Sequence, residues 1–183
     1  MQDILKVEKV TESIVRITMA DEKTGNSLSD QMINLLSTTI IEVSVDKLIK
    51  VIVIAATGKI FCSGHNLKEI TAARENNDQG ESYFRDLFES CSTLMQSIVN
   101  CPKPVIAEID GIATAAGCQL VASCDLAVAS DSSSFATPGV NLGLFCSTPM
   151  VALSRNVNKK DAMKMLLTGD MIDSAEAKRI SLI

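Results

Sequence analysis

The sequence predicts an α/β fold with a mainly parallel sheet. Short apolar runs rich in β-branched residues alternate along the 183 residues with longer runs in which apolar residues recur every three or four positions. Strands that alternate with helices need crossover connections, and such connections join parallel strands. The chain contains no Trp, one Tyr and five Phe, so we expect a core built mainly from aliphatic side chains.

The first half of the chain begins with an expected hairpin of two short strands, at 6–10 and 13–19. A polar loop follows over 21–27. Ser29 is a residue type that caps helices, and the apolar residues after it keep helical spacing: Met32, Leu35, Leu36, Ile40 and Val43. The apolar run at 49–56 is typical of a strand that is buried on both faces.

The second half contains a long amphipathic helix between Phe84 and Ile98, which Pro102 and Pro104 end. A second strand of almost wholly buried side chains is expected at 105–109, and a short helix of small residues at 115–123. The elements expected after these are strand pieces at 126–129 and 134–135, a helix with Thr148 as cap and Pro149 as first residue, and two short helices, the last opened by Ser174.

The bulk composition excludes several kinds of function. A net charge of −5 argues against a nucleic-acid-binding surface, because phosphate binding needs clustered Lys and Arg. No apolar run approaches the length of a membrane span, and no secretory signal is visible. Six cysteines without a C-x-x-C pair accompany a single His, so we expect buried free thiols and no metal site. The expected location is the cytoplasm for a bacterial protein, or the mitochondrial matrix for a eukaryotic protein whose transit peptide has been removed.

Two glycine-bearing turns carry most of the functional information. One is Phe-Cys-Ser-Gly-His-Asn-Leu-Lys-Glu at 61–69, and the other is Asp-Gly-Ile-Ala-Thr-Ala-Ala-Gly-Cys-Gln-Leu at 110–120. Each follows an apolar strand and leads into a helix start, where backbone N–H groups lack partners within the helix. Turns from two neighbouring strands can aim two such groups at one carbonyl oxygen, which is the arrangement of an oxyanion hole.

In residue type and spacing these turns resemble the crotonase (enoyl-CoA hydratase/isomerase) superfamily, and the similarity extends over 4–183. The resemblance implies a ClpP/crotonase-like spiral of repeated β-β-α units, in one domain over 1–183 that lacks the family's C-terminal helices. It implies an acyl-CoA thioester as substrate or ligand, with no cofactor besides the CoA that is part of the substrate. It also implies a homotrimer, or a hexamer of paired trimers.

The resemblance also assigns roles to individual residues. The amide of His65, directly after Gly64, and the amide of Ala116, directly before Gly117, would form the oxyanion hole. The resemblance implies that Lys68 approaches the CoA phosphate. Without the resemblance, Lys68 would be interpreted as an ordinary surface lysine. The remaining positions implied in binding the CoA thioester are Lys23, Thr24, Gly25, Cys62, Asn66, Leu67, Pro138 and Ser147.

The chain departs from the family where its hydratases carry two catalytic glutamates. Those positions hold Gln119 and Gly139, and the position of the isomerase carboxylate, near Ser147, is not acidic either. Hydration of an enoyl thioester needs one group to activate water and another to deliver a proton, and an amide does neither, although it can position a water. We therefore expect a protein of acyl-CoA metabolism that is either an enzyme with an unusual acid–base set or a non-catalytic acyl-CoA-binding or regulatory homologue.

Other chemistries find little support in the sequence. Cys146 or Ser147 as a nucleophile would need an activating base. The only His is His65, whose implied role is performed by its backbone amide, although its imidazole remains an alternative general base. A serine peptidase on the related Clp-type fold fails because no separate His can pair with a serine. Carboxylates that could turn toward the pocket are Glu69, Asp86 and Glu89.

Overall fold

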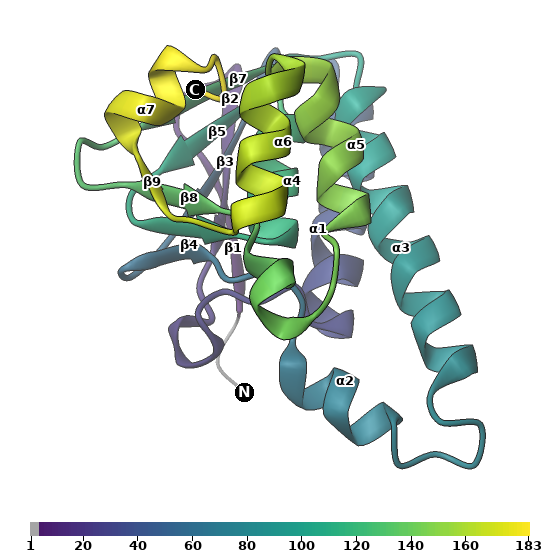
Figure 1. The fold of residues 1–183 in the computed structure, drawn as a ribbon. Coiled ribbons are helices and arrows are strands. Elements are labelled where there is room, and N and C mark those ends of the chain that lie inside the picture. The colour runs from purple at the N-terminus through teal and green to yellow at the C-terminus, as the bar shows by residue number, and fades with distance from the viewer. Residues whose placement is uncertain (1–3) are drawn as a thin grey trace.

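The computed structural model describes residues 4–183, in which nine strands form two sheets (Figure 1). The five-stranded sheet has the order β1-β2-β3-β5-β7, and the four-stranded sheet has the order β4-β6-β8-β9. Only β1 and β9 pair antiparallel to their neighbours, so both sheets are mainly parallel, as predicted. The strands are β1 (Leu5–Lys9), β2 (Ile14–Met19), β3 (Val51–Ala56), β4 (Ile60–Cys62), β5 (Val105–Ile109), β6 (Ile112–Thr114), β7 (Leu126–Ala129), β8 (Ser134–Ala136) and β9 (Ile172–Asp173).

The chain repeats one unit: a strand of the large sheet, a short strand of the small sheet, and then a helix. This unit occurs as β3-β4-α2, as β5-β6-α4, and as β7-β8 followed by the short helix η2, which confirms the expected spiral of β-β-α units. The helices are η1 (Glu22–Thr24), α1 (Asp30–Val45), α2 (Leu67–Ala73), α3 (Glu81–Val99), α4 (Ala116–Ser123), η2 (Pro138–Leu142), α5 (Ser147–Asn156), α6 (Lys159–Thr168) and α7 (Ser174–Arg179).

A glycine makes the sharp turn from one sheet to the other in the second unit. Gly111 lies between β5 and β6 with a φ of 113°, a conformation that L side chains rarely adopt. A Cβ atom at this position would lie 2.2 Å from the carbonyl oxygen of Lys59, in the corresponding turn of the first unit. Successive units therefore stack backbone against backbone at this corner.

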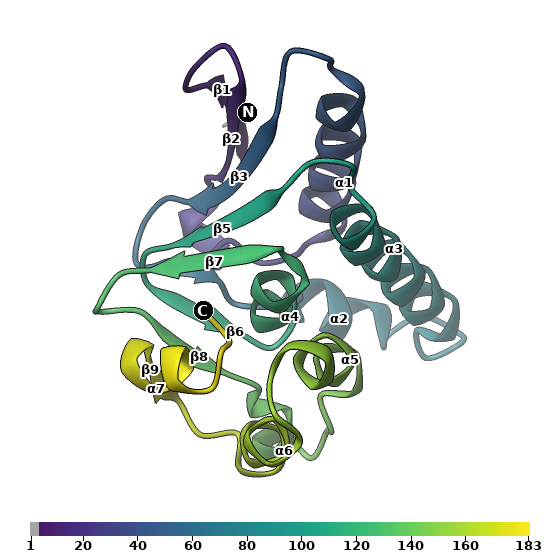
Figure 2. The ribbon, with the colours of Figure 1, turned by 90° about the horizontal axis from the view of Figure 1, so that it is seen from above.

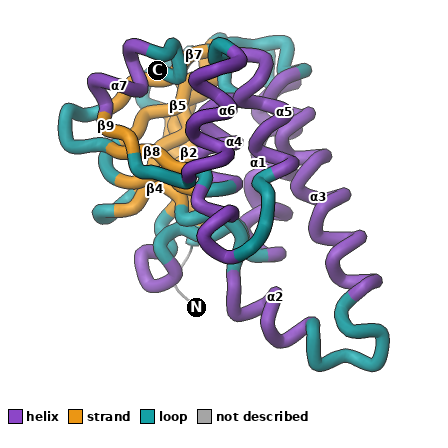
Figure 3. Tube along the Cα trace, viewed as in Figure 1, coloured by secondary structure: helices purple, strands orange, loops and turns teal. Residues whose placement is uncertain are grey.

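The core lies between the large sheet and two helices. α1 and α3 run along one face of that sheet (Figure 2). α4 and α5 lie on the same side of the strands as α1 and α3 (Figure 3). The cluster of buried residues joins the inward side chains of β2, β3 and β5 with those of α1 and α3, and it is mainly aliphatic, as predicted. Ser29 caps α1 by accepting a hydrogen bond from the Met32 amide at 3.2 Å.

Two sequence predictions are wrong in detail. The strands at 49–56 and 105–109 are not buried on both faces: along one face Val53 and Ile106 are only partly covered and Glu108 is exposed, where it pairs with Arg16. Helices cover only one face of this sheet, and a run of apolar residues does not reveal that asymmetry. The two signature turns also follow the short strands β4 and β6 rather than the long strands themselves.

The helix expected to begin at Pro149 in fact begins at Ser147, with Cys146 as N-cap. Pro149 is its third residue, where the missing amide hydrogen is still tolerated because first-turn amides have no intrahelical acceptor. Within residues 4–183, no helix combines the length and apolar character that a membrane crossing requires.

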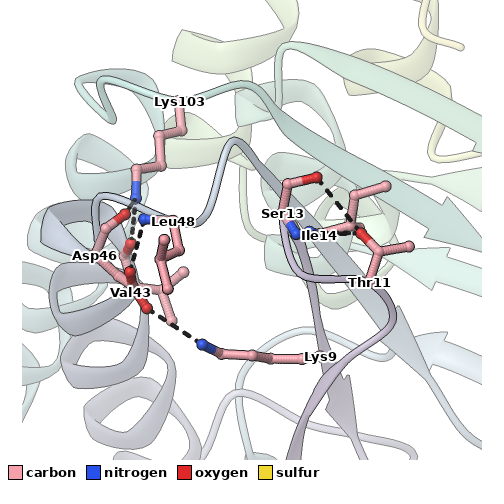
Figure 4. Close-up of polar contacts among 8 residues, drawn as sticks. All are labelled: Lys9, Thr11, Ser13, Ile14, Val43, Asp46, Leu48 and Lys103. Atoms are coloured by element: carbon pink, nitrogen blue, oxygen red, sulfur yellow. Dashed lines mark hydrogen bonds and ion pairs between the residues drawn. The ribbon is translucent and has the colours of Figure 1, made fainter.

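A lysine that is distant in the sequence caps the C-terminal end of α1 (Figure 4). The last turn of α1 carries no basic residue. The Lys103 ammonium donates hydrogen bonds to the carbonyl oxygen of Val43 at 2.6 Å and to that of Asp46, and Lys9 lies 3.5 Å from the Asp46 carboxylate. A cation at this end complements the helix dipole and the unpaired carbonyls.

Replacing Lys103 with Met should lower the free energy of unfolding by about 1–2 kcal/mol, because it removes a charged donor from two helix-end carbonyls and keeps the aliphatic stem. Urea unfolding measures this loss. Lys47→Met is the matched control on the exposed surface nearby and should change stability by less than about 0.5 kcal/mol. Equal effects of the two substitutions would show that Lys103 does not act as a helix cap.

Candidate active site

The two signature turns are in direct contact. Gly64 has a φ of 93°, and a Cβ atom there would lie 2.9 Å from the Cβ of Ala115 and 3.3 Å from the amide nitrogen of Ala116. Only a glycine allows the turn after β4 to approach the start of α4 this closely. The Ala116 amide nitrogen therefore lies against the turn that contains His65.

Both of these amides lack a protein partner. The bridge between Leu28 and the first turn uses the Gly64 carbonyl, which accepts the Leu28 amide at 2.8 Å, and the Ala115 amide donates to Ala136 at 2.9 Å. Among residues 4–183, no hydrogen-bond acceptor is paired with the amide of His65 or of Ala116. Ala116 is the first residue of α4, so its amide belongs to the unpaired N-terminal turn of that helix.

The local backbone that presents Ala116 is strained. Ala115 precedes α4 with φ 52° and ψ −119°, a combination that a residue with a Cβ atom rarely adopts. Such conformations persist only where the surrounding structure imposes them, and they are concentrated at functional sites. Here the bond from the Ala115 amide to β8 and the contact with Gly64 impose it.

Gly117 locks the two turns together. A Cβ atom at Gly117 would lie 2.2 Å from the carbonyl oxygen of Cys62 and 2.8 Å from its Cβ. Burial raises the pKa of the Cys62 thiol to about 12, so this thiol is an inert packing group. All six cysteines are free, three of them are buried, and residues 4–183 contain no cluster of three ligating side chains that could hold a metal ion.

The imidazole of His65 is a packing group in this structure. Its ring lies edge-on to Phe88 with centroids 5.8 Å apart, and both ring nitrogens are buried without a partner in the described chain. Burial lowers the pKa of His65 below its ordinary value, against smaller opposing effects of the Leu28 backbone and of Asp30, so the ring is neutral at physiological pH. A neutral imidazole can accept a proton, but the lowered pKa makes this one a weaker base and both of its nitrogens are buried, which does not favour the alternative role of general base.

Gln119 lines a cavity that also contains Phe88, the ring that contacts His65. The cavity has a volume of about 770 Å³ and is lined by α3, α4 and α5, including Phe88, Met95 and Val151. Gln119 is 7% exposed, and its side-chain oxygen has no hydrogen-bond partner within residues 4–183.

Gly139 leaves no room for a side chain. Its amide donates to the Cys146 sulfur at 3.3 Å, and a Cβ atom at Gly139 would lie 2.6 Å from that sulfur and 2.9 Å from the Leu144 carbonyl oxygen. The thiol of Cys146 thus fills the space into which residue 139 would project. The sequence singled out both residues, but only the structure shows that they exclude each other's side chains.

The first expected CoA loop lies against the His65 turn. The amide of Ser63 donates to Gly25 at 3.1 Å and its hydroxyl donates to Thr24 at 3.3 Å, while Lys23 is exposed beside them. The sequence analysis missed how this loop is held. Asn26 is fully buried with a φ of 50°, its amide donates to the carbonyls of Thr57 and Ile60, and its oxygen accepts from Asp21. The sequence signal for this role is an Asn directly after a glycine, because Asn adopts the left-handed conformation more readily than most residues.

The other predicted binding residues are distributed around the turns. Asn66 caps α2 by accepting from the Lys68 amide at 3.0 Å, and Leu67 and Lys68 are exposed on that helix. Pro138 begins η2, and Ser147 is exposed at the start of α5. No ion pair within residues 4–183 involves Lys23 or Lys68.

The alternative carboxylates are held away from the cavity that Gln119 lines. Glu69 accepts hydrogen bonds from the Asp30 amide and from Asn66, each at 3.1 Å. Tyr83 donates to Asp30 at 3.2 Å, and burial together with these two carboxylates raises the Tyr83 pKa. Asp86 and Glu89 line a separate groove between α1 and α3.

Comparisons with known proteins place this chain among similar sequences and structures. The profile of the enoyl-CoA hydratase/isomerase family matches residues 9–183. The chain is 51% identical over 172 residues to enoyl-CoA hydratase domain-containing protein 3, mitochondrial, of Rattus norvegicus, covering 94% of this chain and 56% of that protein. The corresponding Homo sapiens protein is 51% identical over 166 residues, covering 91% and 53%. The chain therefore spans about half the length of these curated relatives.

Solved structures of similar proteins share the fold. An enoyl-CoA hydratase from Mycobacterium smegmatis superposes with a TM-score of 0.93 and 43% identity, over 100% of this chain and 69% of that one. Human enoyl coenzyme A hydratase domain-containing protein 3 superposes with a TM-score of 0.91 and 48% identity, over 98% and 69%.

Replacing Gly117 with Ala should lower the free energy of unfolding by more than about 3 kcal/mol, since the new methyl group would meet backbone atoms of Cys62 that have no room to move. Thermal or urea unfolding measures this effect. Gly143→Ala is the control: open space surrounds Gly143, and its positive φ alone costs about 1 kcal/mol. A mild effect at Gly117 would mean that the two turns do not touch as described.

The stability of the protein should fall as the pH drops below about 6.5, the ordinary pKa of His. The folded-state pKa of His65 is depressed, so below pH 6.5 the unfolded chain binds a proton that the folded chain does not, with a slope of up to about 1.4 kcal/mol per pH unit. His65 is the only His, so His65→Leu should flatten the unfolding free energy between pH 7 and pH 5.5. An unchanged slope in that variant would contradict a buried, neutral imidazole.

Proposed function

The chain belongs to the enoyl-CoA hydratase/isomerase family, and on that premise we propose that it binds an acyl-CoA thioester with the carbonyl oxygen between the amides of His65 and Ala116. The observation that carries this proposal is the pair of unpartnered amides on two turns that touch through Gly64. Preorganised N–H donors stabilise negative charge that develops on a thioester oxygen when the adjacent carbon loses or gains a substituent. Gln119, one helical turn after Ala116, and Phe88, which contacts the His65 ring, both line the cavity, and this supports a path for the acyl group.

The CoA portion would lie along the two loops beside the hole. Thr24 and Gly25 are packed against Ser63 by two hydrogen bonds, which supports their approach to the pantetheine. Lys23 and Lys68 are exposed, belong to no ion pair in residues 4–183, and are proposed to meet the phosphates. Local cations of this kind suffice for a phosphate ligand even though the whole chain carries a net charge of −5.

We further propose that hydration of enoyl-CoA is very slow in this protein. Gln119 does not exchange a proton at useful pH, and residue 139 has no side chain. The loss of one general acid–base group costs about 10²–10⁴-fold in rate, and two are replaced here. A retained oxyanion hole without its proton-transfer groups favours an acyl-CoA-binding or regulatory role in acyl-CoA metabolism over a conventional hydratase.

The location and assembly of the protein are proposals of the same kind. Relatives with about 51% identity are named as mitochondrial proteins, which supports the mitochondrial matrix for a eukaryotic chain and leaves the bacterial cytoplasm as the alternative. A homotrimer or hexamer is supported by three exposed apolar side chains, which are Leu142 at the end of η2 and Leu144 and Phe145 directly after it. Analytical ultracentrifugation that shows a monomer at tens of micromolar would count against assembly.

Replacing Ala116 with Pro tests the hole directly, because proline removes one amide donor at the first helical position and its ring crowds the adjoining Gly64 turn. We expect the preference for butyryl-CoA over free CoA, measured by calorimetry, to fall by about 10- to 100-fold. Free CoA lacks the thioester carbonyl, so its unchanged affinity is the control for folding. A variant that keeps the preference of the parent would overturn the assignment.

Restoring hydratase chemistry should require three substitutions. Gln119→Glu with Gly139→Glu returns both carboxylates, but the side chain at residue 139 collides with the Cys146 sulfur. Adding Cys146→Ala removes the nearer obstacle and leaves only the Leu144 carbonyl oxygen, 2.9 Å from the Cβ position, for the loop to accommodate, so we expect the triple variant to hydrate crotonyl-CoA at least about 10-fold faster than the double variant. Cys101→Ala in place of Cys146→Ala is the matched control. A parent protein that hydrates crotonyl-CoA at ordinary enzyme rates would contradict the proposed function.

A further inference from the structure

The peptide that carries the proposed His65 donor is held from its carbonyl side. The Gly64 carbonyl and the His65 N–H belong to one planar trans peptide, so they point in opposite directions. The Gly64 carbonyl oxygen accepts a hydrogen bond from the Leu28 amide at 2.8 Å. The direction of the His65 N–H therefore depends on how the segment around Leu28 is placed against the turn.

Glu69 joins the same two segments through a second pair of hydrogen bonds. One carboxylate oxygen accepts from the backbone amide of Asp30, two residues after Leu28, at 3.1 Å. The other oxygen accepts from the side-chain amide of Asn66, which directly follows His65, also at 3.1 Å. This bridge and the bond from Leu28 therefore close a ring of hydrogen bonds that contains the donor peptide.

Both partners of Glu69 are fixed as donors. The backbone amide of Asp30 can only donate. The side-chain oxygen of Asn66 already accepts from the Lys68 amide at 3.0 Å, so its NH₂ group must face Glu69. A carboxylate presents two acceptor oxygens and no donor, whereas a carboxamide presents one acceptor and one donor group. The bridge therefore requires a carboxylate at position 69, and the nearly isosteric Gln breaks it.

The surroundings of Glu69 suit a negative charge that no cation in residues 4–183 neutralises. Glu69 lies in the first turn of α2, and its contact with the Asp30 amide places it at the first residue of α1. The N-terminal ends of two helices therefore face the carboxylate, and such ends stabilise an anion. None of the ion pairs in the described chain involves Glu69. Its charge is directed at these two helix starts.

We propose that Glu69 is a positioning residue of the thioester site, which holds the His65 N–H in the direction of the bound carbonyl oxygen. This inference rests on the proposed function and adds the residue that aims one of its two donors. Glu69 acts through the segment around Leu28 and through Asn66, so its loss loosens the donor and does not remove it. A loosened donor forfeits part of one hydrogen bond to the ligand, which corresponds to about 3- to 10-fold in affinity for the thioester.

The experiment measures the preference of the full chain for butyryl-CoA over free CoA by calorimetry, because only butyryl-CoA has the carbonyl oxygen that the donor would meet. Glu69→Gln breaks the bridge. Asn66→Asp combined with Glu69→Gln reverses one hydrogen bond and restores the bridge, keeps the net charge, and leaves an oxygen for the Lys68 amide. Glu75→Gln is the matched control, because Glu75 is exposed just after α2 and belongs to no ion pair in the described chain. Thermal unfolding without ligand checks that each variant is folded.

Glu69→Gln should lower the preference by about 3- to 10-fold, Glu75→Gln should leave it unchanged, and the double variant should return it to within about twofold of the parent. The inference is overturned if Glu69→Gln keeps the parental preference, even where it unfolds at a lower temperature, because that result shows a role in stability alone. It is also overturned if Glu75→Gln has an equal effect, or if the double variant is not rescued.

The double variant decides the outcome if Glu69→Gln does not fold. A folded double variant with the parental preference supports the bridge, and any other result overturns it. A parent that shows no preference for butyryl-CoA over free CoA contradicts the proposed function itself, whereas the results above concern Glu69 alone.

Discussion

The contact between the turn after β4 and the start of α4 is the interaction on which the candidate site depends. Gly64 and Gly117 have no Cβ atoms, and a Cβ atom at either would overlap the neighbouring turn. That closeness brings the start of α4 against the turn that contains His65, and within residues 4–183 neither the His65 amide nor the Ala116 amide has a hydrogen-bond acceptor. The β-β-α spiral produces the contact, because β4 and β6 are neighbours in the small sheet and each leads directly into one of the turns.

The chemistry of the site follows from what surrounds this contact. In the proposed site two amides are donors for a thioester oxygen, whereas an amide side chain lines the cavity and the Cys146 sulfur occupies the space next to Gly139. Amide donors stabilise negative charge on a thioester oxygen whichever group transfers the proton. A protein can therefore bind and polarise an acyl group without hydrating it. A site of this kind suits recognition of acyl-CoA better than rapid turnover.

Much of this arrangement could be predicted from the sequence, and the failures have physical causes. The helix cap at Ser29 is a local pattern that was predicted correctly, and the β-β-α spiral was implied by the family resemblance that the turn motifs around Gly64 and Gly117 carry. Burial on the second face of β3 and β5 depends on which helices cover the sheet, which an apolar run does not encode. The clash of residue 139 with Cys146 and the three hydrogen bonds of Asn26 join residues that are distant in the chain or in different elements, so no spacing rule reveals them.

The most direct measurement of the central claim is a crystal structure of the protein with bound butyryl-CoA. The account predicts that the thioester oxygen lies about 2.7–3.1 Å from the amide nitrogens of both His65 and Ala116, with the acyl chain entering the cavity beside Gln119. A thioester oxygen that contacts only one of these amides, or that faces solvent while the acyl chain lies outside the cavity, would contradict it.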